Sequence, residues 1–188
     1  MRSTLLALVF GAIAGWAGMA QSAPIVANGD FETGDFTGWT VSPSANILIT
    51  PVAIAGNFSA SLGDVSASPG SLSQTLTTTP GTLYAISFLL QNQDTAQSNA
   101  FTVMFGSDIV FSETNALSDP SPVAVTVFDT ALSGSTLLSF IDTNDQSDWL
   151  LDDVTVNVAA VPEPSAALLV FTAVAGVLAA ARRRRARS

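Results

Sequence analysis

The chain of 188 residues contains no cysteine, no histidine and no lysine. Disulfide bonds are therefore excluded, and so are the usual zinc sites, which need cysteine or histidine ligands. A cysteine nucleophile and a Ser-His-Asp triad are excluded for the same reason. A calcium site remains open, because calcium is bound by oxygen atoms alone.

Positive charge is missing from the whole middle of the chain. All six basic residues are arginines at the two ends, and residues 24–161 hold 14 of the 15 Asp and Glu with no basic residue. The middle therefore carries a net charge of −14. A field of that sign repels phosphate backbones and attracts cations, so nucleic acid is not expected as a partner.

The N-terminus has the three-part pattern of a secretory signal peptide. Arg2 is followed by an uncharged apolar run over residues 5–18 and by small residues around Ala20. This pattern predicts a signal peptide over residues 1–22, removed after Ala20 or Ser22, and hence an exported protein. The alternative is an uncleaved membrane helix, for which the run is short.

Three features follow one another at the C-terminus. Pro162, Glu163 and Pro164 precede an uncharged apolar segment, residues 166–181, and a cluster of five arginines ends the chain. The segment predicts a transmembrane helix with the arginines on the cytoplasmic side, so that the domain faces outward. The prolines prevent structure from continuing out of the domain into that helix.

In this order, residues 161–188 resemble the PEP-CTERM sorting signal of Gram-negative bacteria. The resemblance implies that an exosortase-type membrane protease recognises Pro162, Glu163 and Pro164 and removes the tail. The protein would then pass from a transient inner-membrane anchor to the cell surface or to the extracellular polysaccharide matrix. The alternative is a plain single-pass anchor.

Residues 23–160 are predicted to form one all-β domain. Short runs of alternating apolar and polar residues are separated by Gly, Pro, Asn, Asp and Ser, and no helical period is present. Eight or nine strands without helices indicate a β-sandwich or barrel. The clearest predicted strands are 45–50, 71–78, 82–91, 100–105, 109–112, 123–128, 135–142 and 149–158.

The last predicted strand places a carboxylate among apolar residues. Alternation puts Asp152 on the same face as Leu150, Val154, Val156 and Val158, which predicts that its side chain points inward. A buried carboxylate needs a partner, and the domain has no basic side chain to supply one. A calcium ion or backbone N–H groups must meet its charge, unless Asp152 lies hydrated at a strand end.

Two motifs carry a second resemblance. The opening Asn28-Gly29-Asp30-Phe31-Glu32 with Gly38-Trp39, and the closing Leu151-Asp152-Asp153-Val154, resemble carbohydrate-binding modules of the galactose-binding-domain-like jelly-roll type. The resemblance implies a jelly-roll β-sandwich whose first and last strands lie together and hold a structural calcium. Glu32 and Asp152 match the calcium ligands, with Asp30 and Asp153 as further candidates.

The expected function follows from these parts. Trp39 and Trp149 are the candidate aromatic platforms for a sugar, because both lie near predicted loops. For Trp39, which follows a Gly-rich turn, a position in the core is the favoured alternative, and for Trp149 the two roles stay open. No catalytic residue is predicted, since Asp152 and Asp153 point to opposite faces of a strand and cannot flank one bond. We expect an exported, non-catalytic surface or matrix protein associated with exopolysaccharide. The alternatives are a carbohydrate-binding module with a defined sugar ligand and, less favoured, a secreted glycan-active enzyme.

Overall fold

The computed structural model describes residues 25–42, 46–64, 69–95, 98–145 and 147–159. The predicted signal peptide and the predicted sorting tail lie outside these residues, and no helix within them is long and apolar enough to cross a membrane. The described residues form ten strands: β1 (Thr40–Ser42), β2 (Ile47–Thr50), β3 (Ser59–Leu62), β4 (Gly70–Thr77), β5 (Leu83–Asn92), β6 (Asn99–Phe105), β7 (Asp108–Thr114), β8 (Val123–Thr130), β9 (Ser135–Asn144) and β10 (Trp149–Val158).

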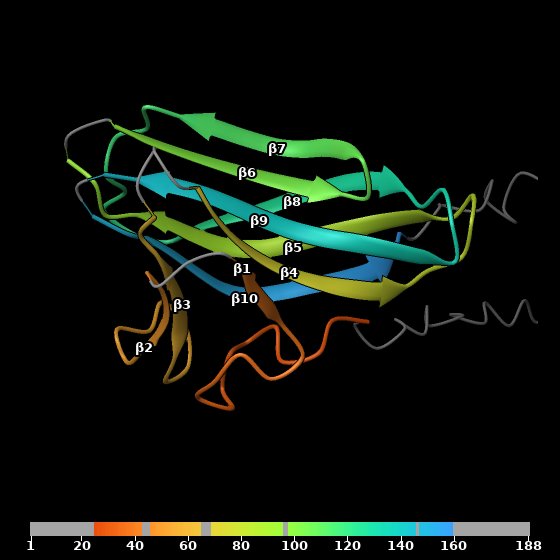
Figure 1. The fold of residues 1–188 in the computed structure, drawn as a ribbon, viewed down its shortest axis with the longest axis horizontal. Coiled ribbons are helices and arrows are strands. Elements are labelled where there is room, and N and C mark those ends of the chain that lie inside the picture. The colour runs from red at the N-terminus through yellow and green to blue at the C-terminus, as the bar shows by residue number, and fades with distance from the viewer. Residues whose placement is uncertain (1–24, 43–45, 65–68, 96–97, 146, 160–188) are drawn as a thin grey trace, which may run out of the picture.

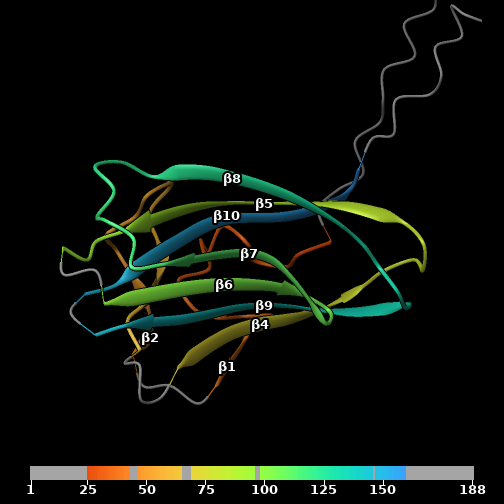
Figure 2. The ribbon, with the colours of Figure 1, turned by 90° about the horizontal axis from the view of Figure 1, so that it is seen from above.

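The strands form two five-stranded antiparallel sheets packed face to face (Figures 1 and 2). The order is β1-β4-β9-β6-β7 in one sheet and β2-β3-β10-β5-β8 in the other. Figure 2 shows β8, β5 and β10 in one layer and β6, β9 and β4 in the other. The all-β jelly-roll sandwich predicted from the sequence is confirmed.

Aromatic side chains fill the space between the sheets. Phe140 of β9 lies at the centre, with its ring centroid 5.5 Å from that of Phe88, 6.0 Å from that of Trp39 and 6.1 Å from that of Phe101. Phe88 comes from the opposite sheet, so these contacts join the two layers. Pairs at such distances add about 0.5–1.5 kcal/mol each to the stabilisation from burial.

Two of the ten strands were not predicted. The three-residue strand β1 is too short to show a periodic pattern. Strand β3, with the sequence Ser-Ala-Ser-Leu, has no β-branched or aromatic residue, yet all four of its residues are buried. It forms because it lies between β2 and β10 and hydrogen-bonds to both, which is a tertiary effect.

The start and the end of the described chain are held together (Figure 1). The Ile25 N–H donates to the Val156 carbonyl at 3.1 Å, and the Val154 N–H donates to the Gly29 carbonyl at 2.8 Å. A Cβ on Gly29 would lie 2.0 Å from the Val154 carbonyl oxygen, so only glycine permits this approach. The opening segment therefore meets the last strand, but the expectation that the first strand lies beside it is wrong, because β1 pairs with β4 in the other sheet.

A β-bulge in β10 changes which face its residues occupy. Asp152 is opposite Leu89 and Thr155 is opposite Ser87, so one extra residue is inserted between them, and Asp153 adopts a left-handed φ of 49°. Leu151 before the bulge and Val154 and Val156 after it belong to the core.

The predicted single face running from Leu150 to Val158 is thus wrong. Because Leu151 faces the core, Leu150 and Asp152 lie on the outer side of the sheet. The sequence pattern gave no sign of the bulge, since the left-handed residue that creates it is an aspartate and not a glycine.

Candidate functional site

Asp152 is fully buried, as predicted, but beneath a loop and not in the core. One carboxylate oxygen, Oδ2, accepts hydrogen bonds from the Ala55 N–H at 3.1 Å and the Ser59 hydroxyl at 2.8 Å. The other, Oδ1, accepts from the Asp153 N–H at 2.8 Å. Burial raises the pKa of the Asp152 carboxyl, and these three donors oppose that shift. Backbone N–H groups and a hydroxyl therefore stabilise the negative charge of Asp152, which is one of the alternatives that the sequence left open.

Glu32 holds the same loop from its outer side. Its carboxylate accepts from the Asn57 N–H at 2.6 Å, the Asn57 side-chain amide at 2.7 Å and the Phe58 N–H at 3.0 Å. The hydrogen bond from the Asn57 side chain is the main reason that the pKa of Glu32 lies below its usual value. We call Glu32 and Asp152 the loop clamp, because together they fix residues 55–59 against β10.

The other two predicted calcium ligands lie elsewhere on the surface. Asp30 and Asp153 are exposed and line a hollow of about 280 Å³ together with Gly29 and Thr155. Within the part of the chain that the structure describes, no three Asp or Glu side chains are grouped as a metal centre. The four predicted ligands thus form two pairs; each loop-clamp carboxylate accepts three hydrogen bonds, whereas Asp30 accepts one long bond from the Glu32 N–H at 3.4 Å.

Neither predicted aromatic platform presents a ring to a ligand. Trp149 is completely buried and Trp39 is 8% exposed, and both belong to the core. Trp39 packs on Phe31 at 5.7 Å and donates its indole N–H to the Asn28 carbonyl. A sugar stacks only on an accessible ring face, so neither tryptophan is a platform. The core position favoured for Trp39 is confirmed, and the stacking role considered for Trp149 is wrong.

The exposed aromatic ring is Phe128 on β8. It is 60% exposed, and no other aromatic side chain in the described ranges is as accessible. Phe128 is opposite Ala85 of β5, which is opposite Asn157 of β10. These three residues form a row across the outer face of the second sheet.

A parallel row of hydroxyl side chains lies beside the first. Thr126 is opposite Ser87, and Ser87 is opposite Thr155. The Ser87 and Thr126 hydroxyls are hydrogen-bonded at 2.9 Å, and Thr155 also lines the hollow next to Asp30 and Asp153. We call the two rows the outer strip; its members are Phe128, Ala85, Asn157, Thr126, Ser87 and Thr155.

The sequence of β8 does carry a signal for Phe128. Val125 and Val127 alternate with Thr126 and Phe128, and the valines pack against the core. The same alternation therefore places Phe128 on the solvent side. Proximity to a loop is the wrong criterion for finding the exposed ring in this domain, because a strand presents it to solvent.

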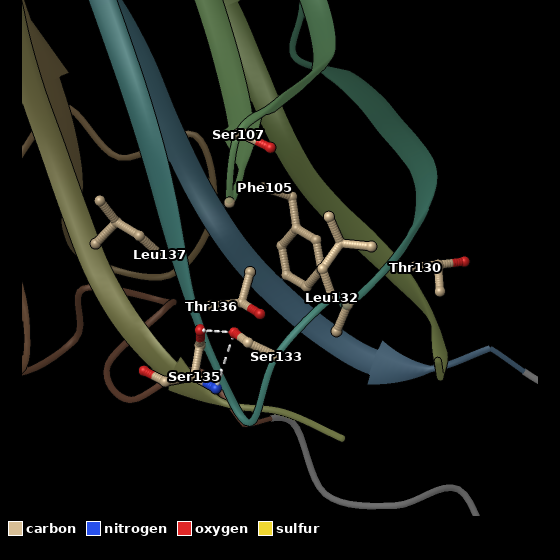
Figure 3. Close-up of a pocket in the computed structure, with 10 residues that line it drawn as sticks. Phe105, Ser107, Thr130, Leu132, Ser133, Ser135, Thr136 and Leu137 are labelled. Atoms are coloured by element: carbon tan, nitrogen blue, oxygen red, sulfur yellow. Dashed lines mark hydrogen bonds between the residues drawn. The ribbon is translucent and has the colours of Figure 1, made fainter. Parts of the chain in front are cut away.

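A second hollow lies at the turn end of the sandwich (Figure 3). Its volume is about 180 Å³, and the β6–β7 and β8–β9 turns enclose it. Phe105 and Leu132 provide apolar surface, and Ser133 is hydrogen-bonded within its own turn to Ser135. Its volume is below the roughly 300–1,000 Å³ usual for small-molecule pockets. The outer strip is therefore the better candidate for a binding surface.

Comparison with known proteins identifies solved structures with a similar fold. No protein-family model and no curated protein matches the sequence. Among solved structures, the chain is similar to the carbohydrate-binding module TmCBM61 in complex with β-1,4-galactotriose. The TM-score is 0.59 and the identity 16%, over 73% of this chain and 100% of that one.

Two further similar structures have different functions. The CBM22-1 xylan-binding domain of Paenibacillus barcinonensis Xyn10C matches with a TM-score of 0.53 and 22% identity, over 70% of this chain and 93% of the domain. A Stig cyclase from Fischerella sp. TAU matches with a TM-score of 0.53 and 15% identity, over 74% and 98% of the two chains. At these identities the likeness shows the fold alone, and a fold hosts several functions.

Proposed function

We propose that this protein is a non-catalytic carbohydrate-binding module that binds an extracellular polysaccharide on its outer strip. The observation that carries the proposal is the 60% exposed Phe128 ring, which shares a row with the Asn157 amide and lies beside a row of hydroxyl side chains on a sheet face. The similarity to solved modules that bind galactotriose and xylan supports it at the level of fold.

The chemistry of the outer strip suits a sugar chain. A pyranose ring has an apolar face of C–H groups, which packs on an aromatic ring, and an edge of hydroxyls, which needs hydrogen-bond partners. Strands are about 4.8 Å apart, so the row from Phe128 to Asn157 extends roughly 10 Å, the length of about two sugar units. The small Ala85 between them leaves the strip flat.

Other side chains supply the hydrogen-bond donors for sugar hydroxyls that basic residues would otherwise provide. Thr126, Ser87 and Thr155 offer hydroxyls, Asn157 offers an amide, and the exposed carboxylates of Asp30 and Asp153 accept hydrogen bonds from sugar hydroxyls. This donor and acceptor set continues from the strip into the adjoining hollow through Thr155.

The site of action is proposed from the ends of the chain alone. We infer export from residues 1–22 and removal of residues 161–188 by an exosortase-type membrane protease acting at Pro162–Pro164. The released domain would have lost all six arginines and would act at the cell surface or in the polysaccharide matrix. Expression in hosts with and without an exosortase tests this step, because the tail is cleaved only in the first. Cleavage in both hosts, or in neither, would contradict it.

A structural calcium at the loop clamp stays a prediction. Glu32 and Asp152 each accept three hydrogen bonds, while a carboxylate has about four acceptor positions, so each retains about one position for a cation. Calcium would add a bond between the loop and β10 that the donors do not supply.

Retention on immobilised polysaccharides tests the proposed function. The purified protein is passed over β-1,4-galactan, xylan and the matrix polymer of the host, each with and without calcium. Delayed elution on at least one polymer, without release of reducing sugars, is the expected result. Elution with the void volume on every polymer would exclude a carbohydrate-binding role, and release of reducing sugars would indicate the enzyme alternative.

A further inference from the structure

The end of the sandwich where β9 finishes and β4 and β10 begin contains a buried carboxylate that the outer strip does not use (left end in Figure 1). Asp142 of β9 is 1% exposed. Its Oδ2 accepts the Asp64 N–H at 2.9 Å, and its Oδ1, which is also buried, has no hydrogen-bond partner among the described residues. An unmet buried carboxylate oxygen requires a proton or a cation.

A second carboxylate faces this oxygen. Asp64, at the end of the β3 segment, is 4% exposed. A Cβ on Gly70 would lie 1.9 Å from Asp64 Oδ2 and 2.9 Å from Asp142 Oδ1, so both oxygens converge on the same point beside that glycine. The two carboxylates come from different sheets, because Asp142 lies in β9 and Asp64 follows β3, which belongs to the opposite layer.

The charges around Asp142 are all negative. Its pKa is raised to about 7, first by burial and then by the charges of Asp64 and Asp148, against the lowering effect of the Asp64 N–H. No Lys, Arg or His exists between residues 24 and 161, so no side chain of the domain can neutralise the pair. Two carboxylates with no basic neighbour are a donor set for a hard divalent cation.

We propose that Asp64 and Asp142 bind a divalent cation, with calcium as the fitting ion, and that this ion ties the end of the β3 segment in one sheet to β9 in the other. Calcium accepts irregular oxygen geometry and balances the charge of two carboxylates. The site is separate from the loop clamp, since it shares no residue with Glu32 and Asp152. It is also independent of the proposed sugar binding.

Calcium and terbium titrations of the purified full chain test the site. Terbium replaces calcium, and its emission can be excited through a nearby indole. Trp149 follows Asp148 and donates its ring N–H to the Thr143 carbonyl, one residue from Asp142, so it is positioned to sensitise an ion there. Calorimetry with calcium chloride alone gives the affinity. Asp142→Asn and Asp64→Asn are compared with Asp108→Asn, an exposed control.

The expected result is indole-sensitised terbium emission that calcium displaces, with an affinity lowered about tenfold or more in both site variants and unchanged in Asp108→Asn. Glu32→Gln is expected to keep this binding, which assigns the ion to Asp64 and Asp142 and not to the loop clamp. Both asparagine substitutions keep the side-chain shape, and far-ultraviolet circular dichroism verifies that the sandwich folds. Binding lost in Glu32→Gln but kept in Asp142→Asn would overturn the proposal. So would an absence of calcium binding at pH 8 combined with higher stability of Asp142→Asn, because the pair would then share a proton.

Discussion

Replacement of Asp152 by alanine tests how strongly this carboxylate of the loop clamp holds residues 55–59 against β10. The substitution leaves the half-buried Ala55 N–H and the buried Ser59 hydroxyl without their acceptor. Each unsatisfied buried donor costs about 1–3 kcal/mol. Burial raises the pKa of the Asp152 carboxyl, which means that its charged form is disfavoured at this position. Removing the carboxylate therefore offsets part of the lost stability. We expect a net destabilisation of about 3 kcal/mol.

Urea denaturation followed by tryptophan fluorescence measures this loss, since Trp39 and Trp149 are both buried in the core. The matched control is Asp153→Asn, which removes the neighbouring, exposed charge and keeps a residue type that tolerates a left-handed φ. Its free energy of unfolding should lie within about 0.5 kcal/mol of the original chain.

The same urea titration, run with chelator and with calcium, distinguishes whether hydrogen-bond donors of the protein or a bound cation stabilise the charge of Asp152. In chelator, the expected loss of about 3 kcal/mol is present in full, because protein donors supply the hydrogen bonds. A loss that appears only when calcium is added would show that a cation, and not the loop, is the main partner of Asp152. A variant as stable as the original chain under both conditions would refute the loop clamp.

Three further predictions follow from individual contacts. Gly29→Ala places a Cβ 2.0 Å from a β10 carbonyl oxygen and should lower the free energy of unfolding by about 2 kcal/mol or more, whereas Gly134→Ala, 3.8 Å from its nearest atom, should be nearly neutral in the same urea assay. In chelator, the stability linked to Asp142 is complete below pH 3.8 and is lost as pH rises through about 7, because its raised pKa means that the folded state holds the proton more tightly. Asp142→Asn should remove this decrease in the free energy of unfolding with pH. An identical decrease in the variant would show that it does not arise from Asp142. Calcium should raise the Tm less in Glu32→Gln than in the original chain, because the variant keeps only the ion proposed at Asp64 and Asp142; an equal rise in both would show that no calcium binds at the loop clamp.

Most of the fold could be predicted because most strands show a clean two-residue period. The same period also indicates that Asp142 is buried, because it lies two residues beyond Phe140 and four beyond Leu138 along β9 and so shares their face. It failed at β3, whose small residues are buried by two neighbouring strands, and at the bulge beside Asp153. Neither feature has a local signal, because both depend on what packs against the segment.

The candidate site was predicted less well than the fold. The sequence singled out the carboxylates as unusual, yet most of their partners are donors from residues 55–59, a loop and the first residue of β3 that no motif connects to Glu32 or Asp152. The stacking role considered for Trp149 was wrong because closeness to a loop does not establish exposure, whereas the core position favoured for Trp39 is correct. Trp149 lies at the first position of a central strand and is covered completely.

The outer strip is tested most directly by calorimetric titration of the best-retained polysaccharide into the original chain, Phe128→Ala and Leu137→Ala. A phenylalanine has an area of about 150–250 Å², so a sugar covering one face of this 60% exposed ring buries roughly 60 Å² and contributes about 1.5 kcal/mol. The account predicts that Phe128→Ala raises the Kd roughly tenfold, while Leu137→Ala, which removes a 45% exposed side chain on the other sheet, leaves it unchanged. An unchanged Kd in Phe128→Ala, with the protein folded, would contradict the assignment of the outer strip as the sugar-binding surface.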